Sequence, residues 1–365
     1  LAKQHFLLFK KVLENENLNV QLLTSKIKGS EQVDTRFQLS QNKVDIVVGT
    51  HSLFQEKTTF NNLGLIVIDE QHKFGVQQRI NLSLKGSVNT DVLLMTATPI
   101  PRTLILTNYG DMDISTINEK PFNNTTINTL AKPAEKMDDV MFFLKKRLDE
   151  KDQVYWVTPL IEESEKLKLT PAVKRYEYLK KKLKVEVGLV HGAMKSEEKN
   201  KIMEDFISGK IKVIVSTTVI EVGIDNQNAN TMIIENCERF GLSQLHQLRG
   251  RVGRGKVDAH CLLLYSKNIG INGKKRIQIL KSSLDGFYIS EEDLKLRGFG
   301  DIIGYKQSGE KDFIIADPAY HSDLFQLAKE EIENLENKNV KLEQHFSQLL
   351  KIFKKDRVLN IIDTG

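Results

Sequence analysis

The chain alternates short runs of β-branched or aliphatic residues with segments that have helical periodicity. Before residue 120 the strand-like runs cover 19–24, 45–50, 65–69 and 91–96. A second set covers 153–158, 186–190, 212–216, 231–235 and 260–265. Strands that alternate with helices in this way form parallel sheets with helices packed against them. The sequence therefore predicts an α/β protein with two parallel-sheet domains, and the helical patterns after residue 274 predict an all-helical C-terminal region.

Polar residues that can carry chemistry follow several of these strands. In chain order they are Thr50, His51, Asp69, Glu70, Thr96, Thr98, His191, Thr217 and Thr218. Parallel sheets bind their ligands at the carboxyl ends of their strands. We therefore expect one functional edge in each sheet.

Asp69 and Glu70 end the aliphatic run at 65–68. Such a continuous aliphatic run predicts a strand that is buried on both faces. Successive side chains on an extended strand point apart, so the two carboxylates should have different roles. Many α/β strands end in acids, however, and the pair alone identifies no chemistry.

The segment 244–255 predicts a short helix followed by a glycine-broken turn with three arginines, Arg249, Arg251 and Arg254. Glycine lets the backbone approach a ligand closely, and the planar guanidinium suits a phosphate. If Arg251 and Arg254 lay on a helical turn, their spacing of three would make them face the same way. The alternative is a basic surface loop.

The composition excludes few classes of function. A formal net charge of +5 permits nucleic-acid binding without requiring it. No apolar run approaches the roughly 18 residues that a membrane helix needs, so we expect no membrane association. Cys237 and Cys261 are isolated, which favours buried thiols in a reducing cytoplasm over a disulfide or a metal site.

Three segments resemble RecG helicases, a family within helicase superfamily two. The run 244–255, with His246 before Gln247, is similar to the last ATPase motif of that superfamily in the form that occurs in RecG. Gln71 and His72 follow the acid pair as in RecG, with Lys73 in place of an arginine. The run 95–103 looks like one shared by RecG and the transcription-repair coupling factor. The resemblance extends from residue 1 to about residue 309.

The resemblance implies a role for each matching residue. Asp69 would hold Mg²⁺ on the nucleotide, and Glu70 would activate the attacking water. Arg251 and Arg254 would reach the γ-phosphate, and Gln247 would act with them in catalysis. Gly223 and Asp225 would approach the nucleotide. Nucleic-acid contacts are implied for Thr50, His51, Thr96, Thr98, Arg102, His191, Thr217 and Thr218. Coupling of ATP use to movement on DNA is implied for Gln71, His72, Arg297 and Gln307.

The resemblance also implies an architecture of two RecA-like domains, with the first incomplete. The expected divisions are a first domain at 1–120, a linker at 121–150, a second domain at 151–268, a translocation hairpin and loop at 269–312 and a helical tail at 313–365. The implied activity is that of a monomeric, ATP-dependent DNA helicase that branch-migrates and regresses stalled forks and recombination intermediates. Forked or branched DNA is the implied partner, and single-stranded DNA-binding protein is a candidate one.

The phosphate-binding loop G-x-x-x-x-G-K-[S/T] does not occur in these 365 residues. The first five residues look like the tail of the next helicase motif, so we expect a chain truncated just after that loop. Two other readings stay open. One is the motor of the transcription-repair coupling factor, for which an acid at position 71 and a tyrosine at 246 are expected. The other is an inactive fragment that only binds DNA.

Overall fold

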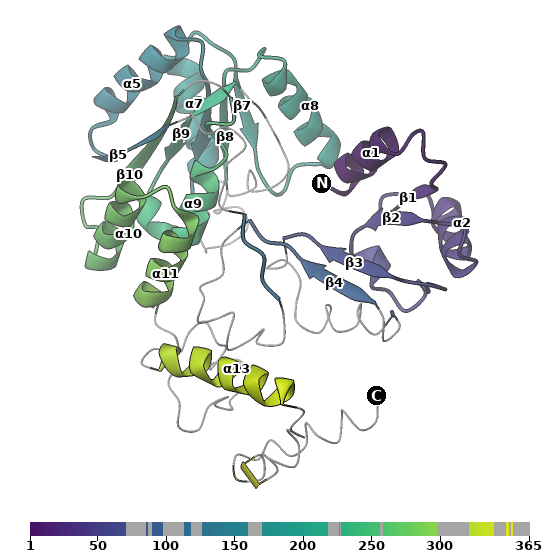
Figure 1. The fold of residues 1–365 in the computed structure, drawn as a ribbon. Helices are drawn as coiled ribbons and strands as arrows, with labels where there is room; N and C mark the ends of the chain where they lie inside the picture. Colours follow the sequence, from purple (N-terminus) through teal and green to yellow (C-terminus); the bar gives the residue numbers. More distant parts are fainter. Residues whose placement is uncertain are drawn as a thin grey trace. The chain divides into compact units, whose positions relative to one another are not determined.

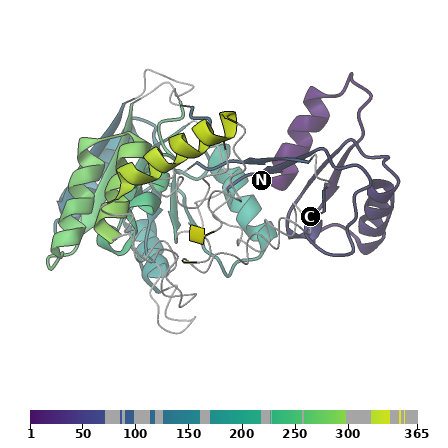
Figure 2. The same ribbon diagram turned by 60° about the horizontal axis from the view of Figure 1, so that its bottom comes forward.

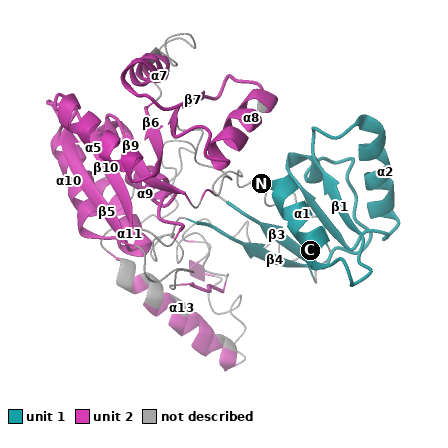
Figure 3. Cartoon of the chain, turned by 90° about the horizontal axis from the view of Figure 1, so that it is seen from above, with its two compact units in different colours: residues 1–97, 222–224 teal, residues 98–221, 225–365 magenta. Residues whose placement is uncertain are grey.

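The computed structural model describes residues 1–70, 85–86, 90–97, 113–117, 126–159, 170–217, 226, 228–255, 258–297, 321–338, 348–349 and 352. The chain divides into two compact units (Figure 3). Unit 1 contains Leu1–Ala97 with Val222–Ile224, and unit 2 contains Thr98–Glu221 with Asp225–Gly365.

The described strands of unit 1 form two separate parallel pairs, β1-β2 and β3-β4 (Figure 1). The elements of this unit are α1 (Ala2–Val12), β1 (Val20–Leu23), α2 (Gly29–Ser40), β2 (Ile46–Gly49), the short 3-10 helix η1 (His51–Leu53), β3 (Leu65–Ile68) and β4 (Asp91–Leu94). All four strands lie where the aliphatic runs predict them.

Strand β3 is buried on one face only. Ile66 and Ile68 are buried against a small cluster of neighbouring apolar side chains, Phe54, Leu63, Val92 and Leu94. On the other face Leu65 is 58% exposed and Val67 is 50% exposed. The prediction of a strand buried on both faces is therefore wrong, because successive side chains point to opposite faces and only one face of β3 is packed.

Unit 2 contains a longer series of alternating strands and helices. Its elements are β5 (Ile127–Pro133), α5 (Met137–Asp149), β6 (Gln153–Val157), α7 (Thr170–Lys182), β7 (Val187–Val190), α8 (Ser196–Ile207), β8 (Val213–Ser216), β9 (Ala229–Ile234), the 3-10 helix η4 (Cys237–Arg239), α9 (Leu242–Arg249), β10 (Ala259–Tyr265), α10 (Ile271–Ser282), α11 (Gly286–Arg297) and α13 (Ser322–Asn337).

The strands of unit 2 form one six-stranded sheet in the order β5-β10-β9-β6-β8-β7, and every pair in it is parallel. Helices cover both faces. Trp156 on β6 packs into a core with α5 and α7, whereas its neighbour Tyr155 points to the opposite face and contacts Phe206 of α8, with ring centroids 5.1 Å apart. This double cover buries β6, β8 and β9 along their whole length.

The linker expected at 121–150 is mostly part of unit 2. β5 pairs with β10 along its full length, from Ile127 opposite Ala259 to Pro133 opposite Tyr265. Helix α5 then adds Val140, Met141 and Leu144 to the main core. The expectation of a connector is therefore wrong for residues 127–149. Pro133 does not break the sheet, because an edge strand tolerates a missing backbone donor at its end.

The helices predicted after residue 270 are present as α10, α11 and α13. α10 and α11 contact each other and lie side by side in Figures 1 and 2. Beyond α13, most of the helical tail expected at 313–365 lies outside the described residues. None of the described helices is long and apolar enough to cross a membrane.

Both cysteines are free and buried, as predicted. Burial raises the pKa of each thiol to about 12. Cys237 and Cys261 are therefore neutral, unreactive thiols near pH 7.

Candidate nucleotide and nucleic-acid sites

The candidate site of unit 1 lies at the carboxyl ends of its strands. Thr50 and His51 follow β2 and are exposed, whereas Asp69 and Glu70 follow β3 and are half-buried. Thr96 lies two residues beyond β4 and is also half-buried. β3 and β4 pair in register, with Ile68 opposite Leu94, so the acid pair and Thr96 follow neighbouring strand ends. This placement agrees with the general location of ligand sites in parallel sheets.

The acid pair has an unusual backbone. The Glu70 N–H donates to Asp69 Oδ1 at 2.8 Å. Glu70 has φ +53°, in the left-handed region that non-glycine residues adopt at some energetic cost. The turn therefore takes Glu70 off the strand direction, so the extended backbone assumed for the acid pair from the sequence ends before Glu70.

His5 of α1 reaches the acid pair and was not among the predicted site residues. Its Nε2 lies 3.7 Å from Asp69 Oδ2, and that nitrogen is buried although the imidazole side chain is 42% exposed. The two residues are far apart in the sequence, so only the fold brings them together.

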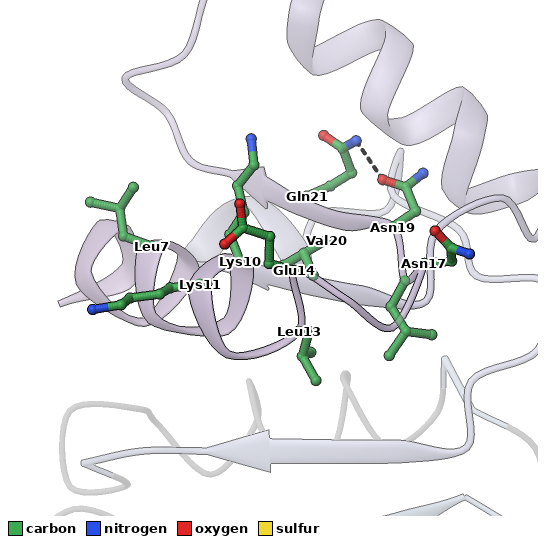
Figure 4. Close-up of a pocket in the computed structure, with 10 residues that line it drawn as sticks. Leu7, Lys10, Lys11, Leu13, Glu14, Asn17, Asn19, Val20 and Gln21 are labelled. Carbon is green, nitrogen blue, oxygen red and sulfur yellow. Dashed lines mark hydrogen bonds between the residues drawn. The ribbon is translucent and has the colours of Figure 1, made fainter.

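Unit 1 also has an open hollow of about 530 Å³ beside α1 and β1 (Figure 4). Lys10 and Lys11 of α1 line it together with Glu14, which follows the helix, and Gln21 Nε2 donates to Asn19 Oδ1 at 2.8 Å on its other side. None of the described residues that line it is a predicted site residue. The hollow is therefore separate from the strand-end site.

Three polar side chains gather at the carboxyl ends of β7 and β8 in unit 2. Thr217 follows β8 and is 1% exposed, Ser216 ends β8 and is fully buried, and His191 follows β7. Thr217 Oγ1, Ser216 Oγ and His191 Nδ1 are buried atoms that have no hydrogen-bond partner among the described residues. Buried hydroxyls normally have a partner, so these atoms are suited to a ligand. Ser216 was missed by sequence reasoning, because it reads as the end of an aliphatic run.

His191 is held in its neutral form. Burial lowers the pKa of this imidazole, the charge of Lys199 lowers it further, and Glu198 partly opposes both. A neutral imidazole can donate from one ring nitrogen and accept at the other. His191 can therefore contact a hydroxyl or a phosphate oxygen without carrying a charge.

The arginine turn, residues 250–255, begins where α9 ends. The helix stops at Arg249, with Gly250 as its C-cap, so the helical spacing considered for Arg251 and Arg254 does not apply. Gly253 has φ +76°, and a Cβ there would lie 3.2 Å from Ala259 Cβ, so glycine is required. Arg254 Nε donates to the Gly250 carbonyl at 3.3 Å, and both arginines of the turn are half-buried.

Arg249 differs from the other two arginines. It is 2% exposed and points into the unit, so it is not available to a ligand on the surface. Gln247, two residues earlier on α9, is half-buried.

The remaining predicted site residues are not described. Gln71, His72, Thr98, Arg102, Thr218, Gly223, Asp225 and Gln307 lie outside the described residues. Arg297 ends α11, but its side chain also lies outside them.

Among the described residues no group of three or more His, Cys, Asp or Glu side chains could hold a metal ion by itself. Mg²⁺ commonly uses one or two carboxylates together with phosphates and water. The Asp69 carboxylate is 42% exposed, and its Oδ1 already accepts the Glu70 N–H. A single accessible carboxylate fits a magnesium ion that arrives on a nucleotide and does not fit an all-protein metal cage.

Comparison with protein families divides the chain into three matched parts. Residues 1–106 match the DEAD/DEAH box helicase family, and residues 135–256 match the helicase conserved C-terminal domain. Residues 283–361 match the C-terminal part of domain 3 of the ATP-dependent DNA helicase RecG.

The chain is similar to several ATP-dependent DNA helicases named RecG. It is 42% identical to that of Thermotoga maritima, 43% to that of Bacillus subtilis and 45% to that of Escherichia coli K12. These matches cover 94%, 92% and 87% of this chain. They cover only 44%, 49% and 46% of the relatives, so the chain spans less than half of their length.

A solved structure of RecG bound to a three-way DNA junction is also similar, with a TM-score of 0.66 and 40% identity. The match covers 89% of this chain and 42% of that one. Yeast Dbp5 bound to RNA and ADP BeF3 has a TM-score of 0.57 at 14% identity, which shows the fold alone.

Two RecA-like α/β units with polar strand ends and an arginine turn define the motor of a superfamily-two helicase. Within that class, the chain belongs to the RecG family.

Proposed function

We propose that this chain is the motor portion of an ATP-dependent DNA helicase that branch-migrates and regresses stalled replication forks and recombination intermediates. The observation that carries the proposal is the set of polar atoms at the strand ends of unit 2 that no described residue pairs with, in a chain of the RecG family. The relative bound to a three-way junction supports branched DNA as the substrate.

The family resemblance supplies the residues that we assign to the nucleotide. ATP with Mg²⁺ would supply the phosphoanhydride bond whose hydrolysis drives movement. We assign Asp69 to the magnesium ion and Glu70 to the proton of the attacking water, as a carboxylate general base. Arg251 and Arg254 would bind the γ-phosphate, because a guanidinium gives paired charged donors to phosphate oxygens. Gln247 is assigned to the catalytic residues from the family resemblance. Gly223 and Asp225 are assigned to the nucleotide from the family resemblance.

DNA would be bound through its backbone. Thr217 Oγ1 and His191 Nδ1 support this assignment, because both are buried polar atoms without a partner in the described part of the chain, and hydroxyls and neutral imidazoles bind phosphate oxygens. The further residues that we assign to nucleic acid are Thr50, His51, Thr96, Thr98, Arg102 and Thr218. Gln71, His72, Arg297 and Gln307 are assigned to the coupling of ATP use with translocation, with the hairpin and loop at 269–312 as the moving element.

We further propose that the protein acts as a monomer in the cytoplasm, where chromosomal DNA lies, with single-stranded DNA-binding protein as a candidate partner. The family resemblance supports these assignments.

The test uses an exchange chimera, in which the matched part of the Bacillus subtilis relative is replaced by this chain. We expect the chimera to hydrolyse ATP faster with a three-way DNA junction than with linear duplex of equal length, and to convert the junction into separated products. The 365-residue chain alone should bind the junction, and Thr217→Ala should weaken that binding. Ser208→Ala, an exposed serine on the same unit, is the control.

A chimera that binds the junction without hydrolysing ATP would contradict the motor assignment and favour a module that only binds DNA. Equal stimulation by linear and branched DNA would contradict the assignment of branched substrates.

A further inference from the structure

Arg249 is the charged residue among the largest fully buried side chains of the described part of the protein, with 2% of its surface exposed. Burial lowers the pKa of its guanidinium. No described carboxylate pairs with it. A buried charge is costly unless other groups stabilise it, so its partners decide what it does.

The partners of Arg249 are acceptors on three different elements. Nη1 donates to the Leu280 carbonyl of α10 and approaches Thr129 Oγ1 of β5 at 3.4 Å, while Nη2 lies 3.3 Å from His246 Nδ1. Leu280 is in the last turn of α10, which ends at Ser282, and carbonyls of a last turn have no partner within their own helix. The guanidinium therefore caps α10 at the negative end of its dipole, which stabilises the buried charge.

A second arginine makes the same type of contact in the opposite direction. Arg276 of α10 donates through Nη1 to the carbonyls of Glu238 and Phe240, at 3.3 and 3.2 Å. These carbonyls belong to the segment that leads into α9. α10 therefore binds the entrance of α9 through Arg276, and α9 binds the C-terminus of α10 through Arg249.

Two more contacts keep the helices close. Ser243 Oγ on α9 donates to Asp293 Oδ2 on α11 at 2.6 Å. Gly273 of α10 lies against η4, and a Cβ there would come within 3.2 Å of Glu238 Cβ. Both contacts belong to unit 2, so the helices and the arginine turn form one packed assembly.

We propose that Arg249 and Arg276 form a reciprocal clasp between α9 and α10 that sets the position of the arginine turn. Both act as positioning residues, since neither needs to touch nucleotide or DNA. The turn begins one residue after Arg249, so a shift of the α9 C-terminus moves Arg251 and Arg254 directly. The role in ATP use rests on the proposed function, whereas the clasp itself does not.

The test measures amide hydrogen exchange in the full 365-residue chain. Arg249→Met removes the charge and leaves the Leu280 carbonyl without its partner, whereas Arg249→Lys keeps the charge but not the planar fork. We expect amides at 250–255 and in the last turn of α10 to exchange at least about tenfold faster in Arg249→Met, because these amides depend on local opening. Arg249→Lys should lie between the parent and Arg249→Met.

Arg276→Met supplies an independent variant. It should accelerate exchange at 238–241 and, through α9, at 250–255 as well. Lys281→Met is the matched control, because Lys281 is an exposed cation on α10. In all of these variants exchange in β6 and β8 should stay at the parent rate.

Unchanged exchange at 250–255 in both arginine variants would overturn the clasp. Exchange that rises equally throughout unit 2 would also overturn it, because it would show general destabilisation. Neither readout uses ATP. If the chimera fails to hydrolyse ATP, the proposed function fails. The amide hydrogen-exchange result still decides whether the clasp exists. If the chimera is active, Arg249→Lys should lower kcat and leave KM within about twofold, since positioning acts in the transition state.

Discussion

The two units place the same kind of chemistry on different scaffolds. Unit 2 has a continuous six-stranded parallel sheet with helices on both faces, and β6, β8 and β9 are buried throughout. In unit 1 the described strands form two separate pairs, and β3 exposes every second side chain. Both units nevertheless present polar residues at the carboxyl ends of their strands.

The difference shows that polar residues can be placed at strand ends without a deep core beneath them. Asp69 and Glu70 are placed by one packed face and a left-handed turn. Thr217 follows a strand of a sheet with two covered faces, and α9, which leads into the arginine turn, makes hydrogen bonds with α10 and α11. We therefore expect substitutions of strand-end residues to lower turnover strongly in both units. We also expect unit 2 to be more stable than unit 1.

The largest expected effect concerns chemistry in unit 1. In the exchange chimera, Glu70→Gln should lower ATP turnover by about 10² to 10⁴, because general-base catalysis contributes that much. Nucleotide binding should be nearly unchanged. The control is Glu56→Gln, an exposed glutamate of the same unit. Turnover within about twofold of the parent would remove Glu70 from the water-activating role.

The arginine turn is the counterpart in unit 2. Arg251→Lys or Arg254→Lys should lower turnover by about 10³, because a point charge does not reproduce the planar fork at a γ-phosphate. Binding of junction DNA without nucleotide should stay at the parent level. Arg239→Lys, an exposed arginine of unit 2, is the control. If DNA affinity falls and turnover survives, these arginines bind the DNA backbone instead.

Substitution of one valine in each unit compares the stability of the two scaffolds directly. Val215 on β8 is fully buried opposite Trp156, whereas Val67 on β3 is 50% exposed. Val215→Ala should lower the free energy of unfolding of unit 2 by about 2 kcal/mol through lost packing. Trp156 is the only tryptophan, so its fluorescence during urea unfolding reports on unit 2.

Val67→Ala should leave the Trp156 transition within about 0.5 kcal/mol of the parent, as for a surface substitution. An equal shift from both valines would show that the units unfold together, and the comparison between them would fail.

The smallest expected effect is the acid sensitivity of unit 2. Burial lowers the pKa of His191 and His260, with Lys199 and Arg147 as the respective second causes. The folded-state pKa then lies below the unfolded value of about 6.5, so the unfolded state binds more protons as the pH falls below that value. Stability should therefore decrease below about pH 6.5.

His260→Gln should reduce this loss, measured as the urea midpoint of Trp156 fluorescence between about pH 7.5 and about pH 5.5. A midpoint that rises as the pH falls would contradict the direction of both pKa shifts.

Sequence patterns predicted most of the fold because aliphatic runs mark parallel strands. All nine strands predicted in this way are present. β5 was missed, because Ile127–Pro133 contains a lysine and ends in proline, and such a segment resembles a connector. As an edge strand it pairs on one side only, and it depends on β10, which is more than a hundred residues away.

The site was less predictable where burial decides the role. The three arginines of 249–254 look alike in the sequence, yet one is buried. Helical spacing offered a hint, because Leu242, Leu245 and Arg249 lie on one face of α9 and are all buried. The contact between His5 and Asp69 could not be predicted, since nothing local relates α1 to the end of β3.

The difference in stability between the two units is tested most directly by limited proteolysis of the 365-residue chain, with fragments identified by mass spectrometry. We expect residues 1–97 to be digested first and a resistant core to begin near Ile127, the start of β5. Cleavage tracks local opening, which should be more frequent where strands are paired on fewer sides and half-exposed. A uniformly resistant chain, or a core that retains β1 to β4 and loses β6 to β10, would contradict this account.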